Sequence, residues 1–181
     1  MLTSITTTPS GIHFKDYPFW PASIYPNGIL AWEHVREIVP DAFPPEIRTR
    51  QGEVLFIAKG EEAALLESAR HYGIPAVKRV DVWSLLLDPF LDTEFDDKIQ
   101  AACASILSQN GIDATHSSAI RERFSSLMDA YNFDTGLWDW LHLGLYDLLL
   151  AHCLFPTHSD FRAVYWETMQ IAEKALKLPS Q

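Results

Sequence analysis

The longest apolar pattern in the chain runs from Thr135 to His152, with the sequence TGLWDWLHLGLYDLLLAH. At about 100° per residue, its Leu, Trp, Gly and Ala residues cover more than half of a helix surface. A helix that is apolar nearly all round belongs in a protein interior, with other helices packed on it. Asp139 and Asp147 lie within the segment, which argues against a membrane span. We therefore predict a core helix over residues 135–152.

Further apolar patterns with a period near 3.6 residues predict more helices. In residues 60–72, Glu61 and Glu62 would lie at the positive end of a helix, and Gly73 would end it. The remaining helices are expected from Asp81 onward, over residues 82–87, from Thr93 to Leu107, over 120–131, and from Thr157 or Ser159 to Leu176.

The N-terminal part has shorter patterns that predict strands. Residues 1–10 are rich in Thr and Ser, and we expect them to be frayed. The short β candidates are Ile12–Asp16, Ala22–Tyr25, Ile29–Trp32 and Val77–Val80. The pair Asn27-Gly28 predicts a tight turn between the second and third of these. The segment 32–38 fits a strand and a helix equally well, and the pattern does not decide between them.

The clearest hairpin lies at residues 47–57. Ile47–Arg50 alternates between apolar and polar residues, Gln51-Gly52 provides the turn, and Val54–Ile57 returns as a continuous apolar run. A continuous apolar run indicates a strand that is covered on both faces. Together these patterns predict an α+β fold in which a small antiparallel N-terminal β-sheet packs against a C-terminal bundle of four to five helices. We expect a single domain over residues 1–181, with a mainly β part at 11–80 that includes one helix, and a helical part at 81–178.

Composition limits the classes of function. The chain has 181 residues, 48% hydrophobic and 12% aromatic, which favours a folded protein over disorder. Its formal net charge of −10 argues against nucleic acid as a ligand, because phosphate binding needs a basic surface. The same charge is compatible with a basic protein partner, although acidity also simply favours solubility.

The two cysteines, Cys103 and Cys153, lie in helical apolar patterns, so we expect buried thiols and no disulfide or zinc framework. The first residues, MLTSITTTPSG, have neither the charged start nor the apolar core of a secretory signal. We therefore expect a cytoplasmic protein, with no membrane among its partners.

Several common catalytic and cofactor motifs are missing from the sequence. It contains no phosphate loop, no dinucleotide-binding glycine pattern, no HExxH, no CxxC and no Gly-x-Ser-x-Gly elbow. We therefore expect no cofactor.

A run of acidic residues falls between residues 81 and 97, with no Lys or Arg among them. Its members are Asp81, Asp88, Asp92, Glu94, Asp96 and Asp97. Carboxylates this close could bind Mg²⁺ or Ca²⁺ through oxygen, but the spacing does not match a calcium-binding loop. Four of them fall near predicted helix starts, where the helix dipole favours negative charge. We adopt this second interpretation and expect no metal site.

The predicted core helix carries one candidate for acid–base chemistry. Asp139, His142 and Tyr146 are spaced three and four residues apart, so a helix would place them on one ridge. A carboxylate beside an imidazole raises the pKa of the imidazole and orients it, as general-base catalysis requires. The alternatives are that these residues form the polar edge of an amphipathic helix, or an interior hydrogen-bond network, without a catalytic role.

Aromatic residues are concentrated in the N-terminal part, at Phe14, Tyr17, Phe19, Trp20, Tyr25 and Trp32. They would form either an exposed patch for a partner or part of the core, and for most of them we expect the core. In the acidic run we expect Phe90, beside the helix-breaking Pro89, to be an exposed anchor. The predicted partner-binding residues are Asp88, Phe90, Asp92 and Glu94, because aromatic anchors ringed by charge are typical of interfaces.

Two functions follow from these patterns. We favour a non-enzymatic protein-interaction module, such as an inhibitor, an immunity-type protein or an adaptor, with a protein partner whose surface is basic. The alternative is a small metal-dependent or acid/base hydrolase that uses Asp139, His142 and nearby carboxylates. A concave pocket in which Asp139 and His142 converge would favour the hydrolase.

Overall fold

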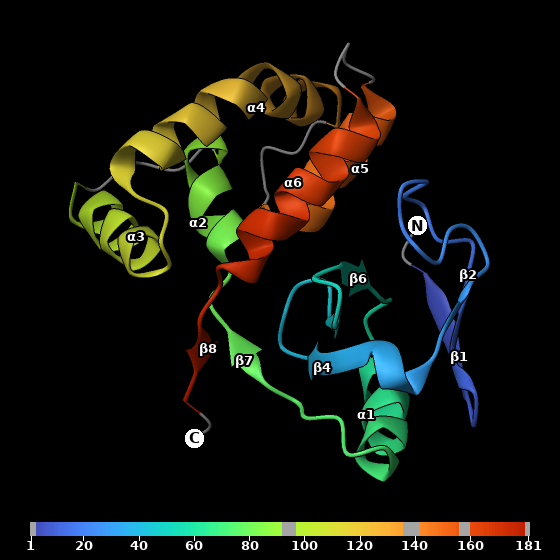
Figure 1. Cartoon of the computed structure of the whole chain (residues 1–181). Coiled ribbons are helices and arrows are strands. Elements are labelled where there is room, and N and C mark those ends of the chain that lie inside the picture. Colours follow the sequence, from blue (N-terminus) through green and yellow to red (C-terminus); the bar gives the residue numbers. More distant parts are fainter. Residues whose placement is uncertain (1–2, 92–96, 136–141, 156–159, 180–181) are drawn as a thin grey trace. The chain divides into compact units, whose positions relative to one another are not determined.

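The computed structural model describes residues 3–91, 97–135, 142–155 and 160–179 (Figure 1). Contacts within the chain divide it into two compact units, and each is described by itself. Residues 1–80 together with 177–181 form the first, which we call the β-rich unit, and residues 81–176 form the second, which we call the helical unit.

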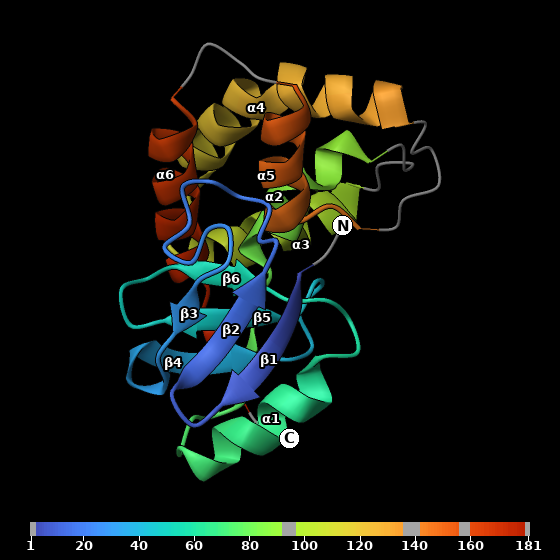
Figure 2. The ribbon, with the colours of Figure 1, turned by 90° about the vertical axis from the view of Figure 1, so that its right-hand side faces the viewer.

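The described part of the β-rich unit contains three small antiparallel sheets instead of the single sheet that we predicted. The first consists of β1 (Ser4–Thr8), β2 (Gly11–Lys15) and β3 (Ile29–Leu30), which Figure 2 shows side by side. The second consists of β4 (Val35–Val39), β5 (Glu46–Thr49) and β6 (Val54–Phe56). The third pairs β7 (Lys78–Arg79) with β8 (Lys177–Leu178), and the unit also contains the 3-10 helix η1 (Trp32–His34) and the α-helix α1 (Glu62–His71).

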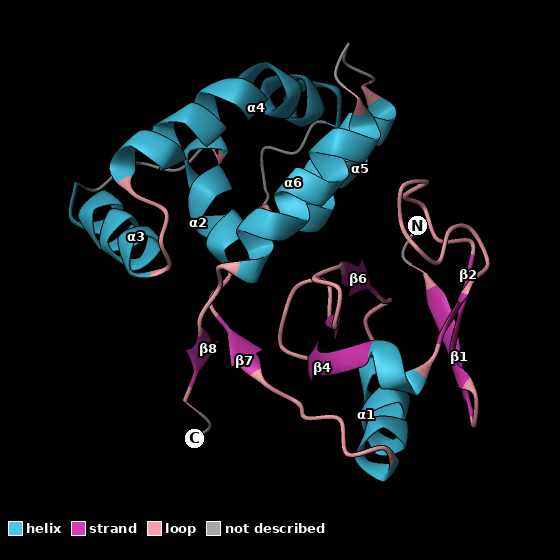
Figure 3. Ribbon diagram, viewed as in Figure 1, coloured by secondary structure: helices cyan, strands magenta, loops and turns pink. Residues whose placement is uncertain are grey.

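The helical unit contains no strand in its described residues (Figure 3). Its elements are α2 (Val82–Leu87), the 3-10 helix η2 (Asp88–Phe90), α3 (Asp97–Gln109), α4 (Ala114–Thr135), α5 (Leu145–Leu154) and α6 (Phe161–Glu173). Strands in the first unit and helices in the second confirm the α+β class. The expectation of a single domain over residues 1–181 stays a prediction.

The hairpin and the first helix lie where the sequence patterns placed them. In the β5–β6 hairpin Arg48 pairs with Val54, and all four residues of Val54–Ile57 are at most 2% exposed. The strand is therefore covered on both faces, as its continuous apolar run predicted. Helix α1 spans Glu62–His71, within the predicted range of 60–72.

Two predictions for the N-terminal part are wrong. Residues 4–8 are not frayed, because they form β1 and pair with β2 from Ser4–Lys15 to Thr8–Gly11. Their β-branched Thr side chains suit a strand, but a pairing partner is needed before that preference has an effect. The expected strand Ala22–Tyr25 forms turns instead, in which Gly28 donates its N–H to the carbonyl of Ile24 (2.8 Å).

The predicted core helix is shorter than its pattern. Residues 136–141 lie outside the described residues, residues 142–144 are not helical, and α5 begins at Leu145. Gly144 is the N-cap of this helix, and its N–H donates to the carboxylate of Asp147 at 2.8 Å. Glycine has a low helix propensity, and the hydrogen bond between Gly144 and Asp147 sets the start of α5. The apolar pattern continues on both sides of this start and so does not mark it. The apolar residues are nonetheless buried, since Leu148 is 1% and Leu149 0% exposed.

Helix α2 contacts α3, α4 and α6 within the helical unit. Its Trp83 is 1% exposed, donates its indole N–H to the carbonyl of Thr168 (3.1 Å) and contacts the ring of Phe124 edge to face. Arg121 of α4 donates to the carbonyls of Leu85 and Leu86 at 3.1 and 3.0 Å. These carbonyls lie in the last turn of α2, where helix carbonyls lack partners within the helix, so Arg121 satisfies the end of α2.

A buried carboxylate joins three basic residues in the β-rich unit. Glu37 of β4 is 0% exposed and lies 2.5 Å from Arg79 of β7, 2.6 Å from Lys177 of β8 and 3.5 Å from Arg36. Burial raises the pKa of Glu37, but the hydrogen bonds from Lys177 and Arg79 and the positive charges outweigh it, and the pKa lies below the usual 4.5. This one carboxylate therefore connects β4 to both strands of the β7–β8 pair.

Among the described residues, no helix has the length and apolar character needed to cross a bilayer. Neither Cys103 nor Cys153 forms a disulfide. The expected burial of both thiols is wrong, because Cys103 is only partly buried and Cys153 is exposed.

Candidate functional site

The predicted ridge of Asp139, His142 and Tyr146 does not form on one helix. Asp139 lies outside the described residues, His142 precedes the start of α5, and Tyr146 is buried in the first turn of α5. The structure places His142 in a different polar cluster, which also contains Asp81, Asp147 and Tyr131.

His142 and Asp81 form the more exposed half of this cluster. The Nε2 atom of His142 lies 3.0 Å from Oδ2 of Asp81, and the two side chains are 28% and 43% exposed. The hydrogen bond with Asp81 raises the pKa of His142 above the usual 6.5, although burial acts in the opposite direction. The other oxygen of Asp81 accepts the N–H of Ser84 at 2.8 Å and so caps α2.

Asp147 and Tyr131 form the buried half. Asp147 is 5% exposed and Tyr131 3% exposed. Burial raises the pKa of Asp147 above 3.8, although the N–H of Gly144 and the nearby His142 lower it. Burial, the charge of Asp147 and the hydrogen bond between the two side chains raise the pKa of Tyr131 to about 12.

Both carboxylates have structural partners. Asp81 caps α2 and Asp147 caps α5, so each aspartate satisfies backbone N–H groups that a helix start leaves without partners. Helix capping therefore accounts for both carboxylates without a catalytic role, and the alternatives given for the ridge of Asp139, His142 and Tyr146 stay predictions. The hydrolase hypothesis also requires Asp139, which the structure does not describe, and it stays a prediction.

We expect the His142–Asp81 pair to make stability depend on pH. A raised folded-state pKa means that the stabilisation is complete below pH 6.5 and is lost as the pH rises through the folded-state pKa. In Asp81→Asn, the pKa of His142 should fall to about 6.5 or below, because burial then acts without the carboxylate. NMR titration of the His142 ring measures this pKa directly.

Asparagine keeps an oxygen that can accept the Ser84 N–H, so this variant removes the charge and retains the cap. Asp160→Asn is the matched control, since Asp160 caps α6 through the N–H of Arg162 and should leave the His142 pKa unchanged. An unaltered His142 pKa in Asp81→Asn would show that the pair is not the cause of the shift.

The structure places half of the predicted partner-binding set. Asp88 and Phe90 lie in η2 and are partly exposed, and the carbonyl of Phe90 accepts a hydrogen bond from Asn132 at 2.7 Å. Asp92 and Glu94 lie outside the described residues. Within the described ranges, no three His, Cys, Asp or Glu side chains are grouped closely enough to hold a metal ion.

The net negative charge of the chain lies in one unit. The helical unit, residues 81–176, contains fifteen Asp and Glu and five Lys and Arg, whereas the β-rich unit contains nine of each. The net charge of −10 therefore belongs entirely to the helical unit. The sequence patterns predicted a boundary between residues 80 and 81, and counting charges on each side of it extends the acidic character from the run at 81–97 to the whole helical unit.

The N-terminal aromatic residues divide between core and surface. Phe14, Tyr17 and Phe19 are at most 3% exposed, and with Phe56 they form a series of edge-to-face contacts at centroid distances of 5.7–6.1 Å. Trp20 and Tyr25 are 44% and 48% exposed. Most of these residues thus belong to the core, as expected.

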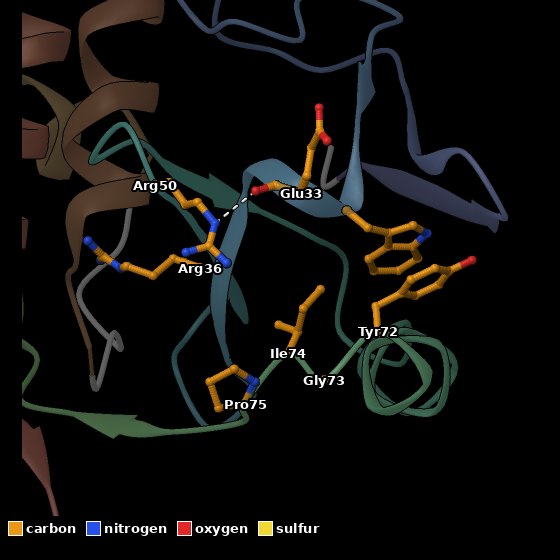
Figure 4. Close-up of a pocket in the computed structure, with 8 residues that line it drawn as sticks. Glu33, Arg36, Arg50, Tyr72, Gly73, Ile74 and Pro75 are labelled. Carbon is orange, nitrogen blue, oxygen red and sulfur yellow. Dashed lines mark hydrogen bonds between the residues drawn. The ribbon is translucent and has the colours of Figure 1, made fainter.

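Sequence analysis missed a cavity in the β-rich unit (Figure 4). Its volume is about 270 Å³, and its lining comes from η1, the start of β4, the residue after β5 and the end of α1. The lining residues are Trp32, Glu33, Arg36, Arg50, Tyr72 and the segment Gly73–Pro75. No sequence spacing connects residues so far apart, and only the fold brings them together.

Comparisons with protein-family models, curated proteins and solved structures found no match to this chain.

Proposed function

We propose that this chain is a non-enzymatic protein-interaction module whose helical unit binds a basic protein surface. The observation that carries the proposal is the confinement of the whole net charge of −10 to residues 81–176. A charge surplus of this size on one unit produces a field that steers an oppositely charged partner and raises its association rate.

Exposed apolar side chains on the same unit supply candidate anchors. On α3, Ile99 and Ile106 are seven residues apart, which places them on one helix face, and they are 56% and 37% exposed. Phe133 of α4 is 81% exposed. Protein interfaces combine a desolvated apolar centre with a polar rim, and we propose the Ile99–Ile106 face of α3 and Phe133 of α4 as two candidate centres.

The predicted partner-binding set of Asp88, Phe90, Asp92 and Glu94 stays part of the proposal, and two of its members, Asp88 and Phe90, are described. Asp88 and Phe90 are partly exposed at the end of α2, and Asp97 at the first turn of α3 is exposed. Phe90 is a weaker anchor than the sequence suggested because it is not fully exposed, so Ile99, Ile106 and Phe133 take over that role in the proposal.

The test is capture of partners from the source cell at low salt, followed by binding kinetics with the purified partner. Neutralising Asp88, Asp92 and Glu94 to Asn, Asn and Gln should lower the association rate constant about tenfold at low salt, because charge acts mainly on association. The difference between variant and wild type should shrink as salt screens the charges.

A matched control neutralises three acids of the β-rich unit, Asp16→Asn, Glu61→Gln and Glu67→Gln. It changes the net charge equally and should leave the association rate near that of the wild type. An equal loss in both variants would show that only total charge matters, and retention of every partner by the first variant would contradict the proposal.

A further inference from the structure

The cavity in the β-rich unit has one apolar side whose two rings are held in place. Trp32 and Tyr72 stack with a centroid distance of 4.6 Å and an interplanar angle of 14°. The indole N–H of Trp32 donates to the carbonyl of Thr8 (2.9 Å), and the hydroxyl of Tyr72 donates to the carbonyl of Pro9 (3.2 Å). Both rings are therefore attached to the β1–β2 turn and would lose little freedom on binding a ligand.

The β1–β2 turn is itself fixed by a glycine. Gly11 has a φ of 153°, and a Cβ at this position would lie 2.4 Å from the carbonyl oxygen of Leu30. No other residue fits this close approach without displacing β3. The close approach of Gly11 to Leu30 of β3 therefore sets the position of the β1–β2 turn, to which both rings are hydrogen-bonded.

A guanidinium faces the cavity from the opposite side. Arg50 donates its Nε–H to the carbonyl of Glu33 at 2.8 Å, and its backbone N–H to the carbonyl of His34 at 2.9 Å. Among the described residues, no carboxylate forms an ion pair with Arg50. Figure 4 shows Arg50 and Tyr72 on opposite sides of the cavity, with Ile74 and Pro75 along its floor.

The other two charged residues of the lining are directed elsewhere. The carboxylate of Glu33 is 80% exposed and lies 3.7 Å from His34, and Figure 4 shows it pointing away from Arg50. Arg36 contacts Glu37 at 3.5 Å, and its side chain runs away from Tyr72 in the same view. Arg50 is accordingly the charged group that would meet a ligand inside the cavity.

We propose that this cavity binds a carboxylate carried on an apolar group. The planar guanidinium group can donate two parallel hydrogen bonds to the two oxygens of a carboxylate. Because the Nε–H of Arg50 already donates to the backbone carbonyl of Glu33, its two terminal nitrogens remain to donate to the ligand. The rings and Ile74 would cover the apolar group. A volume of about 270 Å³ lies just below the usual range for drug-sized ligands, which suits a group of amino-acid size.

Two sources supply this chemistry, the C-terminal residue of a polypeptide and a small free carboxylic acid. The cavity lies in the β-rich unit, whose formal net charge is zero, and the proposed ligand is separate from the partner proposed for the acidic helical unit. If the cavity does not bind a carboxylate, the proposal for the helical unit still stands, because the two surfaces share no residue.

The test uses N-acetyl-L-phenylalanine as the probe and N-acetyl-L-phenylalaninamide as its uncharged counterpart, titrated into the full chain. Binding is followed by NMR at the Trp32 indole N–H and the amides of Gly73 and Ile74. The acid should bind and shift these signals, and the amide should bind at least about tenfold more weakly because it lacks the charge-assisted hydrogen bonds. Acetate, which lacks the apolar group, should also bind more weakly than the probe.

Arg50→Gln should weaken binding of the acid about tenfold or more, and Arg50→Lys should recover part of it through the retained charge. Lys59→Gln, which removes one positive charge from an exposed residue outside the cavity, should bind as the wild type does. Backbone N–H signals of residues outside the cavity should have the same chemical shifts in each variant as in the wild type, which establishes that the variant keeps the fold.

Equal affinity for acid and amide would overturn the proposal, as would equal affinity in Arg50→Gln and the wild type. Binding of acetate or inorganic phosphate as tight as that of the probe would overturn the role of the apolar side. A decapeptide ending in Phe, compared with its amidated form, then distinguishes the two sources: tight binding of the peptide acid assigns a polypeptide C-terminus, and binding of the free acid alone assigns a small carboxylic acid.

Discussion

Replacing Leu148 with alanine is expected to lower the free energy of unfolding of the helical unit by roughly 3–5 kcal/mol. Leu148 is 1% exposed in the middle of α5, and its neighbours Leu149 and Ala151 are fully buried. The loss combines the transfer free energy of the removed methyl groups with the cavity that remains, which this crowded position cannot easily close. Urea denaturation followed by circular dichroism measures the difference.

Leu154 is the control on the same helix. It is 54% exposed at the last turn of α5, so Leu154→Ala should change the free energy of unfolding by less than about 0.5 kcal/mol. Leu145→Ala, at a residue 5% exposed in the first turn, should cost roughly 2–4 kcal/mol. Equal and small effects in Leu148→Ala and Leu154→Ala would place α5 outside the core.

The comparison between α5 and its pattern shows what apolar periodicity can establish. The burial of Leu145, Leu148 and Leu149 could be predicted, because burial follows from the density of apolar residues. The start of the helix could not, since it depends on the hydrogen bond between Gly144 and Asp147. The pattern therefore located the core correctly and extended the helix through residues 142–144 that are not helical.

Whether a short segment forms a strand depends on the strand it pairs with, and the sequence does not identify that partner. The β5–β6 hairpin was predictable because its two strands are close in sequence, separated only by residues 50–53. By contrast, β3 pairs with β2 across thirteen intervening residues, and the segment 32–38 divides into η1 and then β4. A short segment with a mixed pattern takes the structure that its non-local contacts stabilise. For this reason neither a strand nor a helix over the whole of residues 32–38 would have been a correct prediction.

The candidate sites were harder to predict than the fold for the same reason. His142 was selected for its spacing from Asp139 and Tyr146, but its described partner is Asp81, sixty-one residues away. Trp32, Arg50 and Tyr72 have no common motif, and three separate hydrogen bonds to backbone carbonyls bring them to one cavity. Spacing rules detect neighbours on one helix, whereas these sites join residues from different elements.

Replacing Glu37 with glutamine is expected to destabilise the β-rich unit by about 3 kcal/mol at pH 7, because removing one partner of a buried ion pair leaves the other charge without compensation. Glu37 is 0% exposed, and Arg79 beside it is 11% exposed. We place the estimate at the lower end of the range for buried pairs because Lys177 is 52% exposed and water can solvate it.

The effect should depend on pH in a defined direction. The pKa of Glu37 lies below its usual 4.5, so the stabilisation is present above pH 4.5 and is lost as the pH falls through the folded-state pKa. The wild type should therefore lose stability in acid while Glu37→Gln loses less, and the two denaturation curves should approach each other below pH 4.5.

Asp41→Asn is the matched control for this prediction. Asp41 lies 3.0 Å from Lys78, but both side chains are more than half exposed, and such surface pairs contribute at most about 1 kcal/mol. Lys177→Gln should cost less than Glu37→Gln, since Arg79 would still neutralise the carboxylate. A loss in Glu37→Gln no larger than that in Asp41→Asn would mean that Glu37 does not hold the β7–β8 pair to β4.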